Sequence, residues 1–406
     1  MLPQSSSLGS WQGRPVWTEI DLDALAKNVG ALKGQANGAA VLAVVKANGY
    51  GHGAVAVARA ALAAGADRLG VICVDEGEQL RRAGISAPIL VMGHVPLGEA
   101  ERLVELGLTP TITSREMALA LADIARERGV RVAVHLKVDT GLNRYGLSPS
   151  EAIDFARWLR DLAGIEVEGL FTHFASADEA DKSYTVAQHK LFLSVAGEVG
   201  WIPIRHLANT ATLLDLPDMS LEMVRPGLGI YGCYPSNEVK RSLPLRPVLS
   251  LKSRIVRLAP LAVGDCVSYG RTWRASRPSV VGLVMCGFAD GLPRSLSNRG
   301  SVLVRGRRAP IVGRVCMDMC IVDVTDIAEA AVDDEVVIIG RQGEEHIPVE
   351  EVAELAGTSN YEILCGISAR VPRLCLREGH VVSRQTLVAE PEEEMPLSPE
   401  ASRVLG

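Results

Sequence analysis

Residues 41–65 read VLAVVKANGYGHGAVAVARAALAAG and contain one complete strand, loop and helix. The β-branched apolar run of residues 41–45 predicts a buried strand, which a glycine-rich loop follows. The alanine-rich stretch of residues 54–64 predicts a helix that ends at Gly65, and a new apolar run begins at Leu69. A strand, a helix and a second strand in this order form the repeating unit of parallel α/β folds.

The same alternation continues to Gly232. The expected strands are residues 41–45, 69–74, 89–92, 109–112, 132–138, 167–172, 204–207 and 223–231. The expected helices are residues 54–64, 76–83, 97–106, 114–128, 149–162 and 184–199, with Ser114 and Ser148 as N-caps of the fourth and fifth. Eight strands in roughly 210 residues favour a (β/α)8 TIM-type barrel over an open doubly wound sheet.

The pattern changes after Leu245, where short alternating strands are separated by turn sequences. These strands are expected at residues 249–258, 280–285, 301–304, 315–324 and 335–339. The fold class is therefore α/β, with an N-terminal barrel and a C-terminal all-β domain. We divide the chain into an N-terminal tail (1–14), the barrel (15–243), the β-strand domain (244–384) and a disordered tail (385–406), which is acidic and poor in apolar residues.

Composition excludes several classes of protein. The 406 residues carry 42 basic and 48 acidic side chains, and the densest basic run, residues 305–308, is too short for a duplex-binding surface. No apolar stretch reaches the roughly 18–20 residues of a membrane span. The eight cysteines form no C-x-x-C pair, and the N-terminus lacks the apolar segment of a secretion signal. We expect a cytoplasmic protein that binds neither nucleic acid nor membrane.

Lys46 directly follows the first strand of the expected barrel. The active sites of such barrels lie at the carboxyl ends of the strands, where apolar surroundings lower the pKa of a lysine and free its amine as a nucleophile. A lone K-x-x-G is more often a surface lysine beside a flexible turn. The full run of residues 44–53, VVKANGYGHG, is more specific, because it resembles the signature of the alanine racemases.

Further segments carry the same resemblance in family order over about residues 15–380. They are KVDTGLNRYG (137–146), GLFTHFASAD (169–178), HLANT (206–210), VRPGLGIYG (224–232), VSYG (267–270), GRVCMD (313–318), NYE (360–362) and RVPR (370–373). The chain departs from the family pattern at Leu142, Thr210 and Phe288, which stand for methionine, serine and tyrosine.

The resemblance implies an enzyme that interconverts L-alanine and D-alanine with pyridoxal 5′-phosphate (PLP) and supplies D-alanine for peptidoglycan. Lys46 is the implied Schiff-base lysine and one of two acid–base groups. The other is Tyr269 of the partner subunit, in a homodimer with shared active sites. The implied ligands of the cofactor phosphate are Tyr50, Asn209, Thr210, Gly227, Leu228 and Tyr361. Tyr50 is equally a turn aromatic that shields the loop, and Thr210 fits an ordinary helix N-cap as well.

Arg225 is implied to face the pyridine nitrogen of the cofactor. An arginine stays protonated and only donates hydrogen bonds, so the nitrogen remains unprotonated and the ring is a weaker electron sink. Tyr269 is a poor base at its ordinary pKa near 10, and His173 with Arg225 offers a hydrogen-bond network that polarises it. Alone, His173 would more simply be a satisfied strand histidine. The alternative for Arg225 is a surface arginine at a strand end, which its neighbours disfavour.

Four further residues have implied roles at or near the substrate. Arg144 contacts the cofactor phenolate and the substrate carboxylate, and Met317 faces the substrate from the β domain beside Asp318 at the entrance. Lys137 aligns with a lysine that carries a carbamate in the family, which would hold Arg144 as an anion. An unmodified Lys137 paired with Asp139 is the alternative. No metal site is expected.

Other functions remain open from the sequence. A basic amino-acid decarboxylase shares this architecture, but Arg225 argues against it. A non-catalytic PLP-binding protein would need no second domain with Tyr269 and Met317. A racemase of serine or of a broader set of amino acids is harder to exclude, because discrimination by one small group is worth only about 1–3 kcal/mol.

Overall fold

The structure is a computed structural model that describes residues 13–388. Residues 1–12 and 389–406, which make up most of the two predicted tails, lie outside the described residues. The chain forms two compact units. The barrel unit contains residues 24–50 and 54–246, and the strand unit contains the residues before Ala24, residues 51–53 and the residues from Pro247 onward.

Eight parallel strands close into the barrel of the first unit, as the sequence predicts. Each strand pairs with the next in chain order, and the last pairs with the first, Val41 of β2 lying beside Val224 of β9. The strands are β2 (Ala40–Val44), β3 (Arg68–Val71), β4 (Ile89–Val91), β5 (Thr109–Ile112), β6 (Val132–Lys137), β7 (Ile165–Phe171), β8 (Ile204–His206) and β9 (Met223–Val224).

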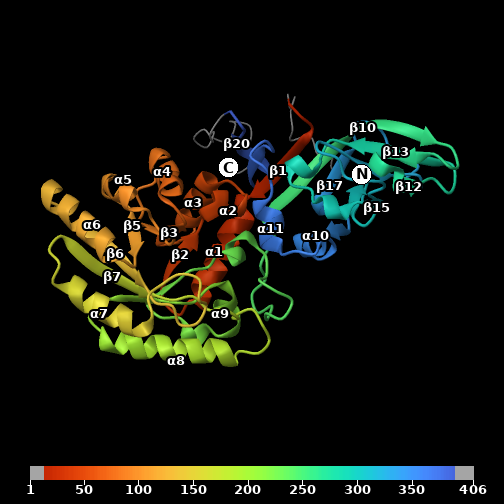
Figure 1. The fold of residues 1–406 in the computed structure, drawn as a ribbon. Coiled ribbons are helices and arrows are strands. Elements are labelled where there is room, and N and C mark those ends of the chain that lie inside the picture. Colours follow the sequence, from red (N-terminus) through yellow and green to blue (C-terminus); the bar gives the residue numbers. More distant parts are fainter. Residues whose placement is uncertain (1–12, 389–406) are drawn as a thin grey trace, which may run out of the picture. The chain divides into compact units, whose positions relative to one another are not determined.

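Helices follow these strands and cover the outside of the barrel, as α4 to α8 show in Figure 1. They are α3 (Ala54–Ala63), α4 (Val74–Arg82), α5 (Ala100–Glu105), α6 (Arg115–Arg128), α7 (Pro149–Arg160), α8 (Ser183–Glu198) and α9 (Thr210–Asp215), with short 3₁₀ turns η1 (Leu97–Glu99), η2 (Pro217–Met219) and η3 (Leu228–Tyr231), while α1 (Leu22–Gln35) precedes β2. The segment α2 (Lys46–Tyr50) has non-helical backbone angles at Ala47, Asn48 and Gly49 and forms the loop after β2. None of the helices in the described part of the chain is both long and apolar enough to span a bilayer.

Local sequence signals fix several of these ends. Ser114 precedes α6, and its hydroxyl accepts a hydrogen bond from the backbone N–H of Met117 at 3.3 Å. Ser148 precedes α7, and the carboxylate of Glu151 accepts from its backbone N–H at 2.9 Å. These contacts satisfy N–H and hydroxyl groups that the helix itself leaves without partners. Both helices therefore begin where the sequence predicts.

Three expected strands are shorter than predicted by two residues or more, and one of them, the run of residues 315–324 in the strand unit, is a strand only at Cys320–Asp323. The run of residues 69–74 leaves the sheet after Val71, because Val74 already opens α4. The run of residues 223–231 is extended only at Met223–Val224. Pro226 then removes a backbone donor, and the apolar residues beyond it form η3 instead of a strand.

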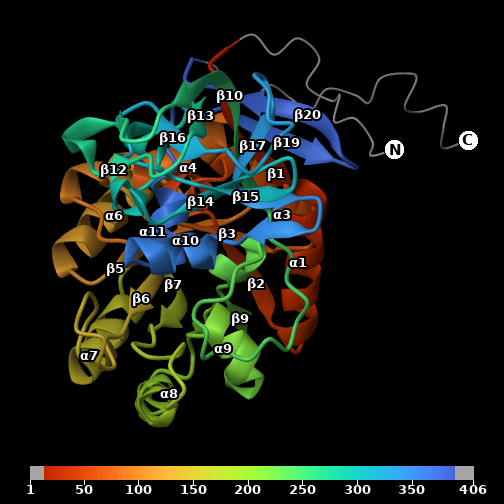
Figure 2. The same ribbon diagram turned by 90° about the vertical axis from the view of Figure 1, so that its right-hand side faces the viewer.

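The strand unit is built mostly from strands, with two short helices near its end. Ten of its strands form one sheet, and β11 and β12 form a separate pair. Figure 2 faces this unit and shows β10, β13 and β16 side by side. Its strands are β1 (Val16–Asp21), β10 (Leu249–Leu261), β11 (Cys266–Val267), β12 (Trp273–Arg274), β13 (Ser279–Val284), β14 (Ser301–Val304), β15 (Arg307–Pro310), β16 (Cys320–Asp323), β17 (Glu335–Gln342), β18 (Glu345–Ile347), β19 (Arg373–Arg377) and β20 (His380–Gln385), and its helices are α10 (Val349–Ala356) and α11 (Asn360–Cys365).

The first strand of the chain lies in this sheet, although the sequence assigns residues 15–243 to the barrel. In β1, Thr18 pairs with Leu251 of β10 in an antiparallel register and with Arg373 of β19 in a parallel register. The sequence analysis predicts no strand at residues 16–21, and a local pattern contains no information on partners more than 200 residues away. At the other end, Gln385, expected in the tail, is the last residue of β20.

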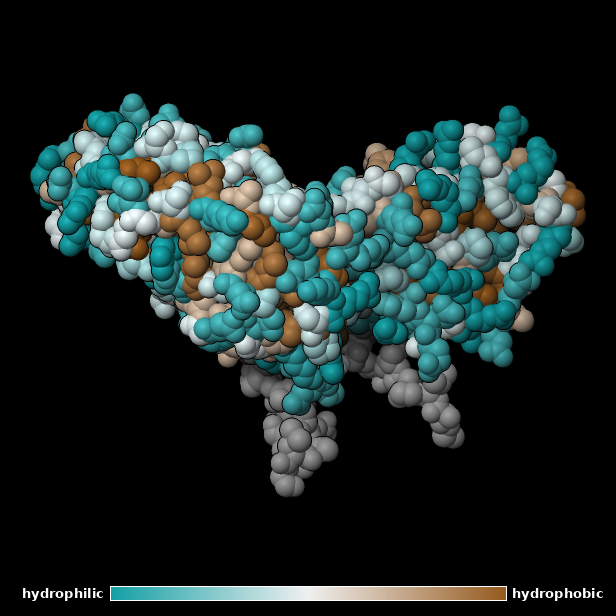
Figure 3. Space-filling view, turned by 90° about the horizontal axis from the view of Figure 1, so that it is seen from below, coloured by the Kyte–Doolittle hydropathy of each residue, from teal (hydrophilic) through white to brown (hydrophobic). Residues whose placement is uncertain are grey.

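Apolar side chains are unevenly distributed over the exposed surface. In the face shown in Figure 3, hydrophilic side chains dominate, and they interrupt the groups of apolar ones. Single exposed apolar residues of this kind are normal for a folded protein. The strand unit nevertheless exposes four large apolar side chains that the sequence analysis names, those of Tyr269 (72%), Met317 (56%), Phe288 (41%) and Tyr361 (37%).

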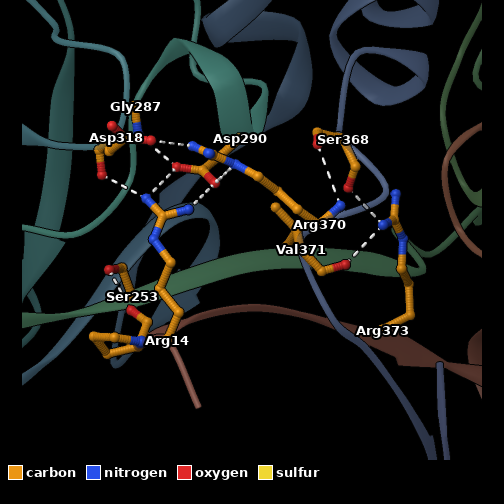
Figure 4. A network of polar contacts seen from close by, with 10 residues as sticks. Arg14, Ser253, Gly287, Asp290, Asp318, Ser368, Arg370, Val371 and Arg373 are labelled. Atoms are coloured by element: carbon orange, nitrogen blue, oxygen red, sulfur yellow. Dashed lines mark hydrogen bonds and ion pairs between the residues drawn. The ribbon is translucent and has the colours of Figure 1, made fainter. Parts of the chain in front are cut away.

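A buried carboxylate joins distant segments of the strand unit (Figure 4). Asp290 has no exposed surface, and Arg14 binds both of its oxygens, at 2.8 Å for Oδ2. Arg370 donates from Nε to Oδ1 at 2.8 Å, and the Gly287 N–H donates to Oδ2 at 2.9 Å. The two arginines also reach the carbonyl and the carboxylate of Asp318. The loop that contains Met317 is thus fixed to the start of the chain and to the segment before β19.

We expect the Asp290→Asn variant to lose about 3–5 kcal/mol of unfolding free energy, because it leaves two arginines partly buried without their shared anion. Urea unfolding followed by circular dichroism measures this loss. The matched control is Asp318→Asn, whose carboxylate is 43% exposed and should contribute no more than about 1 kcal/mol. Equal losses in the two variants would contradict a special role for Asp290.

Candidate active site

The loop after β2 has an unusual backbone that places Lys46 at the carboxyl end of the strand. Ala47, Asn48 and Gly49 all have left-handed φ values, of 52°, 53° and 61°. Left-handed alanine and asparagine are strained, and such conformations persist only where surrounding contacts hold them. Here the carboxylate of Glu76 accepts the Ala47 N–H at 2.7 Å, and the Asn48 side chain accepts the Ala54 N–H at 3.0 Å.

Four cationic side chains surround His173 in the barrel unit. Burial, and after it the charges of Arg225, Arg144, Lys137 and Lys46, lower the pKa of His173 well below its ordinary value. These residues follow or end β2, β6, β7 and β9, so they meet at one end of the barrel. The barrel therefore assembles these five predicted site residues into one electropositive group at the end where active sites of this fold lie.

Arg225 is the most deeply buried of these cations, with 4% of its surface exposed. Its guanidinium donates to the Thr172 carbonyl at 2.8 Å, to His206 Nδ1 at 2.9 Å and to His173 Nδ1 at 3.3 Å, and it lies over the Phe171 ring. Burial lowers the pKa of Arg225 to about 9, so it stays protonated at neutral pH. Within residues 13–388, no carboxylate forms an ion pair with it.

A buried cation without an anionic partner is costly, by several kcal/mol even after the surroundings relax. Hydrogen bonds to neutral acceptors offset part of this free-energy cost, but they cannot replace a negatively charged partner. The four cations around His173 therefore fit an anionic ligand. Among the described residues, no group of three or more histidine, cysteine, aspartate or glutamate side chains is arranged to hold a metal ion.

The ends of β8 and β9 form a second part of the site through Thr210. Its hydroxyl accepts hydrogen bonds from the N–H groups of Gly227 and Gly229, at 3.2 and 3.1 Å. Asn209, and not Thr210, is the N-cap of α9, because its side chain accepts the Thr212 N–H at 3.0 Å. The hydroxyl and backbone groups of two strand ends thus lie together, as expected of a phosphate-binding region.

Tyr50 lies against this region from the lysine loop. A Cβ atom on Gly227 would be only 2.7 Å from the Tyr50 hydroxyl oxygen, so a larger residue at that position would force the tyrosine side chain to move. The Tyr50 ring packs at 4.9 Å from the ring of Tyr231, whose hydroxyl donates to the Val44 carbonyl at 2.9 Å. Leu228 begins η3 beside them. Five of the six expected phosphate ligands, Tyr50, Asn209, Thr210, Gly227 and Leu228, therefore lie together in the barrel unit.

Lys137 ends β6 inside the barrel, with 5% of its surface exposed. Its Nζ donates to the Tyr145 carbonyl at 2.8 Å, and not to Asp139 as the sequence alternative proposed. Asp139 instead accepts N–H groups of its own loop, including that of Arg144 at 3.1 Å. Burial, and then the charges of Arg144 and Arg225, lower the pKa of Lys137 to about 8. A substantial fraction of this amine is therefore neutral near physiological pH.

The remaining expected residues, Tyr269, Met317 and Tyr361, belong to the strand unit and not to the group in the barrel unit. Tyr269 opens the short 3₁₀ turn η4 (Tyr269–Arg271), and Ser268 before it has a left-handed φ of 63°. The Ser268 hydroxyl donates to the Arg314 carbonyl at 2.7 Å, which ties the tyrosine loop to the segment that contains Met317. Tyr361 lies in α11 and is 37% exposed.

Sequence reasoning missed five residues that organise the site. Tyr231 and His206 lie inside motifs that the sequence analysis quotes, but neither was assigned a role. Glu76 bridges the ends of β2 and β3 through the backbones of Ala47 and Ile72. The other two, His135 and Glu168, lie within the barrel strands β6 and β7. Only the closure of the barrel shows that they lie near His206.

A TIM-type barrel with a lysine and three further cations at its active end, together with a strand-rich second unit, defines a two-domain barrel enzyme. Comparison with known families specifies which one. The alanine racemase N-terminal domain matches residues 20–235, and the alanine racemase C-terminal domain matches residues 248–375. The chain therefore belongs to the alanine racemase family, and it is an amino-acid racemase.

Individual relatives agree with this family. The alanine racemase of Halothermothrix orenii is 47% identical over 365 residues, covering 89% of this chain and 96% of the relative. That of Symbiobacterium thermophilum is 48% identical over 364 residues, covering 89% and 97%. The crystal structure of alanine racemase from Bacillus anthracis with bound L-Ala-P is 38% identical, covers 92% of this chain and 98% of that chain, and has a TM-score of 0.86. The alanine racemase of Clostridium difficile 630 has a TM-score of 0.88 at 36% identity, covering 93% and 100%.

Proposed function

We propose that this protein interconverts L-alanine and D-alanine with PLP as its cofactor. The strongest support comes from Arg225, which is a buried cation at the end of the barrel and contacts only neutral acceptors. An anionic cofactor supplies the missing counter-charge. The product D-alanine would serve peptidoglycan synthesis in the cytoplasm.

The residues in the barrel unit fit PLP. Lys46 offers the amine that attaches the cofactor, and Thr210, Asn209, Gly227 and Leu228 offer hydroxyl and backbone groups for its phosphate, with Tyr50 beside them. Tyr361 would add a hydroxyl from the strand unit. When bound, PLP withdraws electrons from the Cα–H bond of an amino acid, which makes that proton removable.

Arg225 determines which reaction follows. Its guanidinium cannot accept a proton, so it would donate to the pyridine nitrogen of a bound cofactor and would leave that nitrogen unprotonated. A carboxylate at this position would favour the protonated ring, a stronger electron sink that suits decarboxylation and transamination. Arginine limits the electron withdrawal, which favours removal and prompt return of a single proton.

Racemisation requires acid–base groups on both faces of the substrate Cα. We assign the group on one face to Lys46 and the group on the other face to Tyr269 of the partner subunit. One of them takes the Cα proton, and the other gives a proton to the opposite face. Burial and the surrounding cations lower the pKa of His173 and keep it neutral, and it accepts a hydrogen bond from Arg225. In this proposal its other ring nitrogen would polarise the hydroxyl of the tyrosine. Arg144 binds the substrate carboxylate, and Met317 limits the size of the side chain.

The first test is chemical trapping and assay. Borohydride reduction of the holoenzyme should leave a pyridoxyl group on Lys46, identified by peptide mapping, and L-alanine should yield D-alanine. The Lys46→Ala variant should lose the adduct and almost all activity. The control Lys27→Ala removes an exposed lysine of α1 and should change neither.

Two outcomes would redirect the proposal. A pyridoxyl group on a lysine other than Lys46 would refute the assignment of the site. An adduct on Lys46 without any racemisation would indicate a non-catalytic PLP-binding protein. Assay of L-serine and larger amino acids in parallel separates an alanine racemase from a broader one, with slower turnover of serine expected, since one hydroxyl gives only modest discrimination.

The second test addresses the shared site. Lys46→Ala and Tyr269→Phe homodimers should each be nearly inactive. Re-association of equal amounts makes about half of the dimers mixed, and each mixed dimer has one intact site, so roughly a quarter of wild-type activity should return. Mass spectrometry checks that mixed dimers form. Mixed dimers without activity would show that the two groups act within a single chain.

The third test concerns carbamylation of Lys137, in which Nζ adds carbon dioxide and releases a proton. Only the neutral amine reacts. Because the pKa of Lys137 is lowered to about 8, the neutral fraction is small near pH 6 and large near pH 9. In ¹³C-bicarbonate, a carbamate signal should therefore grow over this range. The Lys137→Arg variant keeps the charge and cannot form the adduct, so it should show no such signal. A carbamate signal that persists in this variant would show that an amine other than Lys137 carries the carbamate.

A further inference from the structure

A line of hydrogen bonds crosses the interior of the barrel from Arg225. Arg225 Nη1 lies 2.9 Å from His206 Nδ1, and His206 Nε2 lies 2.8 Å from His135 Nδ1. His135 Nε2 lies 3.1 Å from Glu168 Oε2. Arg68 closes the line by donating to both oxygens of Glu168, at 2.8 and 2.5 Å. Four strands, β3, β6, β7 and β8, supply the residues beyond Arg225.

The direction of every bond in this line follows from its first member. Arg225 only donates, so His206 Nδ1 must accept and the His206 proton is on Nε2. That proton is donated to His135 Nδ1, so the His135 proton is also on Nε2. It is donated to Glu168, which as a carboxylate only accepts. One arrangement of protons therefore satisfies all the groups.

Every other arrangement of the protons is electrostatically unfavourable. A proton on His206 Nδ1 would face the N–H of Arg225, donor against donor. A second proton on either imidazole would bury another cation close to Arg225, because both histidines have no exposed surface. Burial lowers the pKa of both imidazoles. Burial alone would raise the pKa of Glu168, but the hydrogen bonds from His135 and Arg68 outweigh it and lower that pKa to about 2.

We propose that His135 and Glu168 are positioning residues of the racemase: they fix the Nε2–H tautomer of His206, whose Nδ1 then holds the Arg225 guanidinium as a donor toward the cofactor ring. This role rests on the proposed function. The negative charge of Glu168 is separated from Arg225 by two neutral rings and is shared with Arg68. Arg225 is thus oriented without being neutralised, and its charge remains directed at the cofactor.

The direct test is the ¹⁵N spectrum of the imidazoles in the wild-type full-length protein, with histidine labelled selectively and the His135 and His206 signals assigned by substitution. Both rings should be neutral Nε2–H tautomers over about pH 6–8, because only that state satisfies every contact. An Nδ1–H tautomer or a protonated ring at either position would overturn the proposal. The tautomers are read from the wild-type protein, and the substituted proteins serve only to assign the two signals.

The second test is Glu168→Gln, which keeps the shape and replaces one acceptor oxygen by an NH₂ group. Either placement of that NH₂ group faces a donor of Arg68, and one placement also requires His135 to reverse. We expect the two imidazole signals to change and kcat for alanine to fall about tenfold to a hundredfold, the range for loss of one charge-assisted contact. KM should change little, because none of these groups touches alanine.

Glu222→Gln is the matched control. Glu222 also receives two bonds from one arginine, Arg205, at the ends of neighbouring barrel strands, but no histidine joins that pair. It should leave the imidazole spectrum and kcat unchanged. An equal fall of kcat in both variants would reduce Glu168 to a structural ion pair and refute the positioning role.

The two proposals fail in different ways. If the protein does not racemise alanine but the wild-type imidazoles have the stated tautomers, the proton arrangement stands and the proposed function falls. If the protein racemises alanine but the tautomers differ, the positioning role of His135 and Glu168 is refuted and the proposed function stands.

Discussion

A protonated arginine buried in a closed barrel with neutral partners is the constraint on which the site depends. Water is excluded from Arg225, so each of its contacts must be a fixed acceptor of the protein, and the backbone carbonyl of Thr172 and two imidazoles provide them. The parallel barrel makes this possible, because the carboxyl ends of β7, β8 and β9 converge on one point. The same convergence brings Lys46, Lys137 and Arg144 close enough to act on His173. A site with this excess of positive charge fits an anionic ligand, which would stabilise it.

The lysine loop shows a related constraint in the backbone. Five successive residues with positive φ, Ala47 to Gly51, are unfavourable, and contacts from Glu76 and Asn48 compensate for part of the strain. The strain and the buried charge lie at the same end of the barrel, beside one another along the closed sheet through the β2–β9 pairing. Surrounding residues that need not contact a ligand stabilise both the strained loop and the buried charge of Arg225. The site therefore depends on many more side chains than those that contact a ligand.

The sequence predicted the barrel because its signals are local. Apolar runs, N-caps such as Ser114 and Ser148 and glycines at helix ends each act within a few residues. It did not assign β1 to the strand unit, because the partners of Thr18 are Leu251 and Arg373, far along the chain. It also extended the run after Met223 too far, since apolar content does not distinguish a strand from the 3₁₀ turn beyond Pro226. For the site, the sequence motifs identified Lys46 and Arg225 but not His135 and Glu168. The role of these two residues depends on the neighbours that they acquire when the barrel closes.

The two units use the same kinds of charge in opposite ways. In the strand unit, Asp290 is in direct contact with Arg14 and Arg370, so the charges neutralise one another and the contact serves to fix loops. In the barrel unit, Glu168 and Arg225 are held apart by His206 and His135, so the carboxylate orients the cation but does not neutralise it. Direct contact would be more stabilising for the folded chain, yet it would remove the positive charge from the site. The interposed imidazoles thus retain at the site a charge that a direct carboxylate contact would have neutralised.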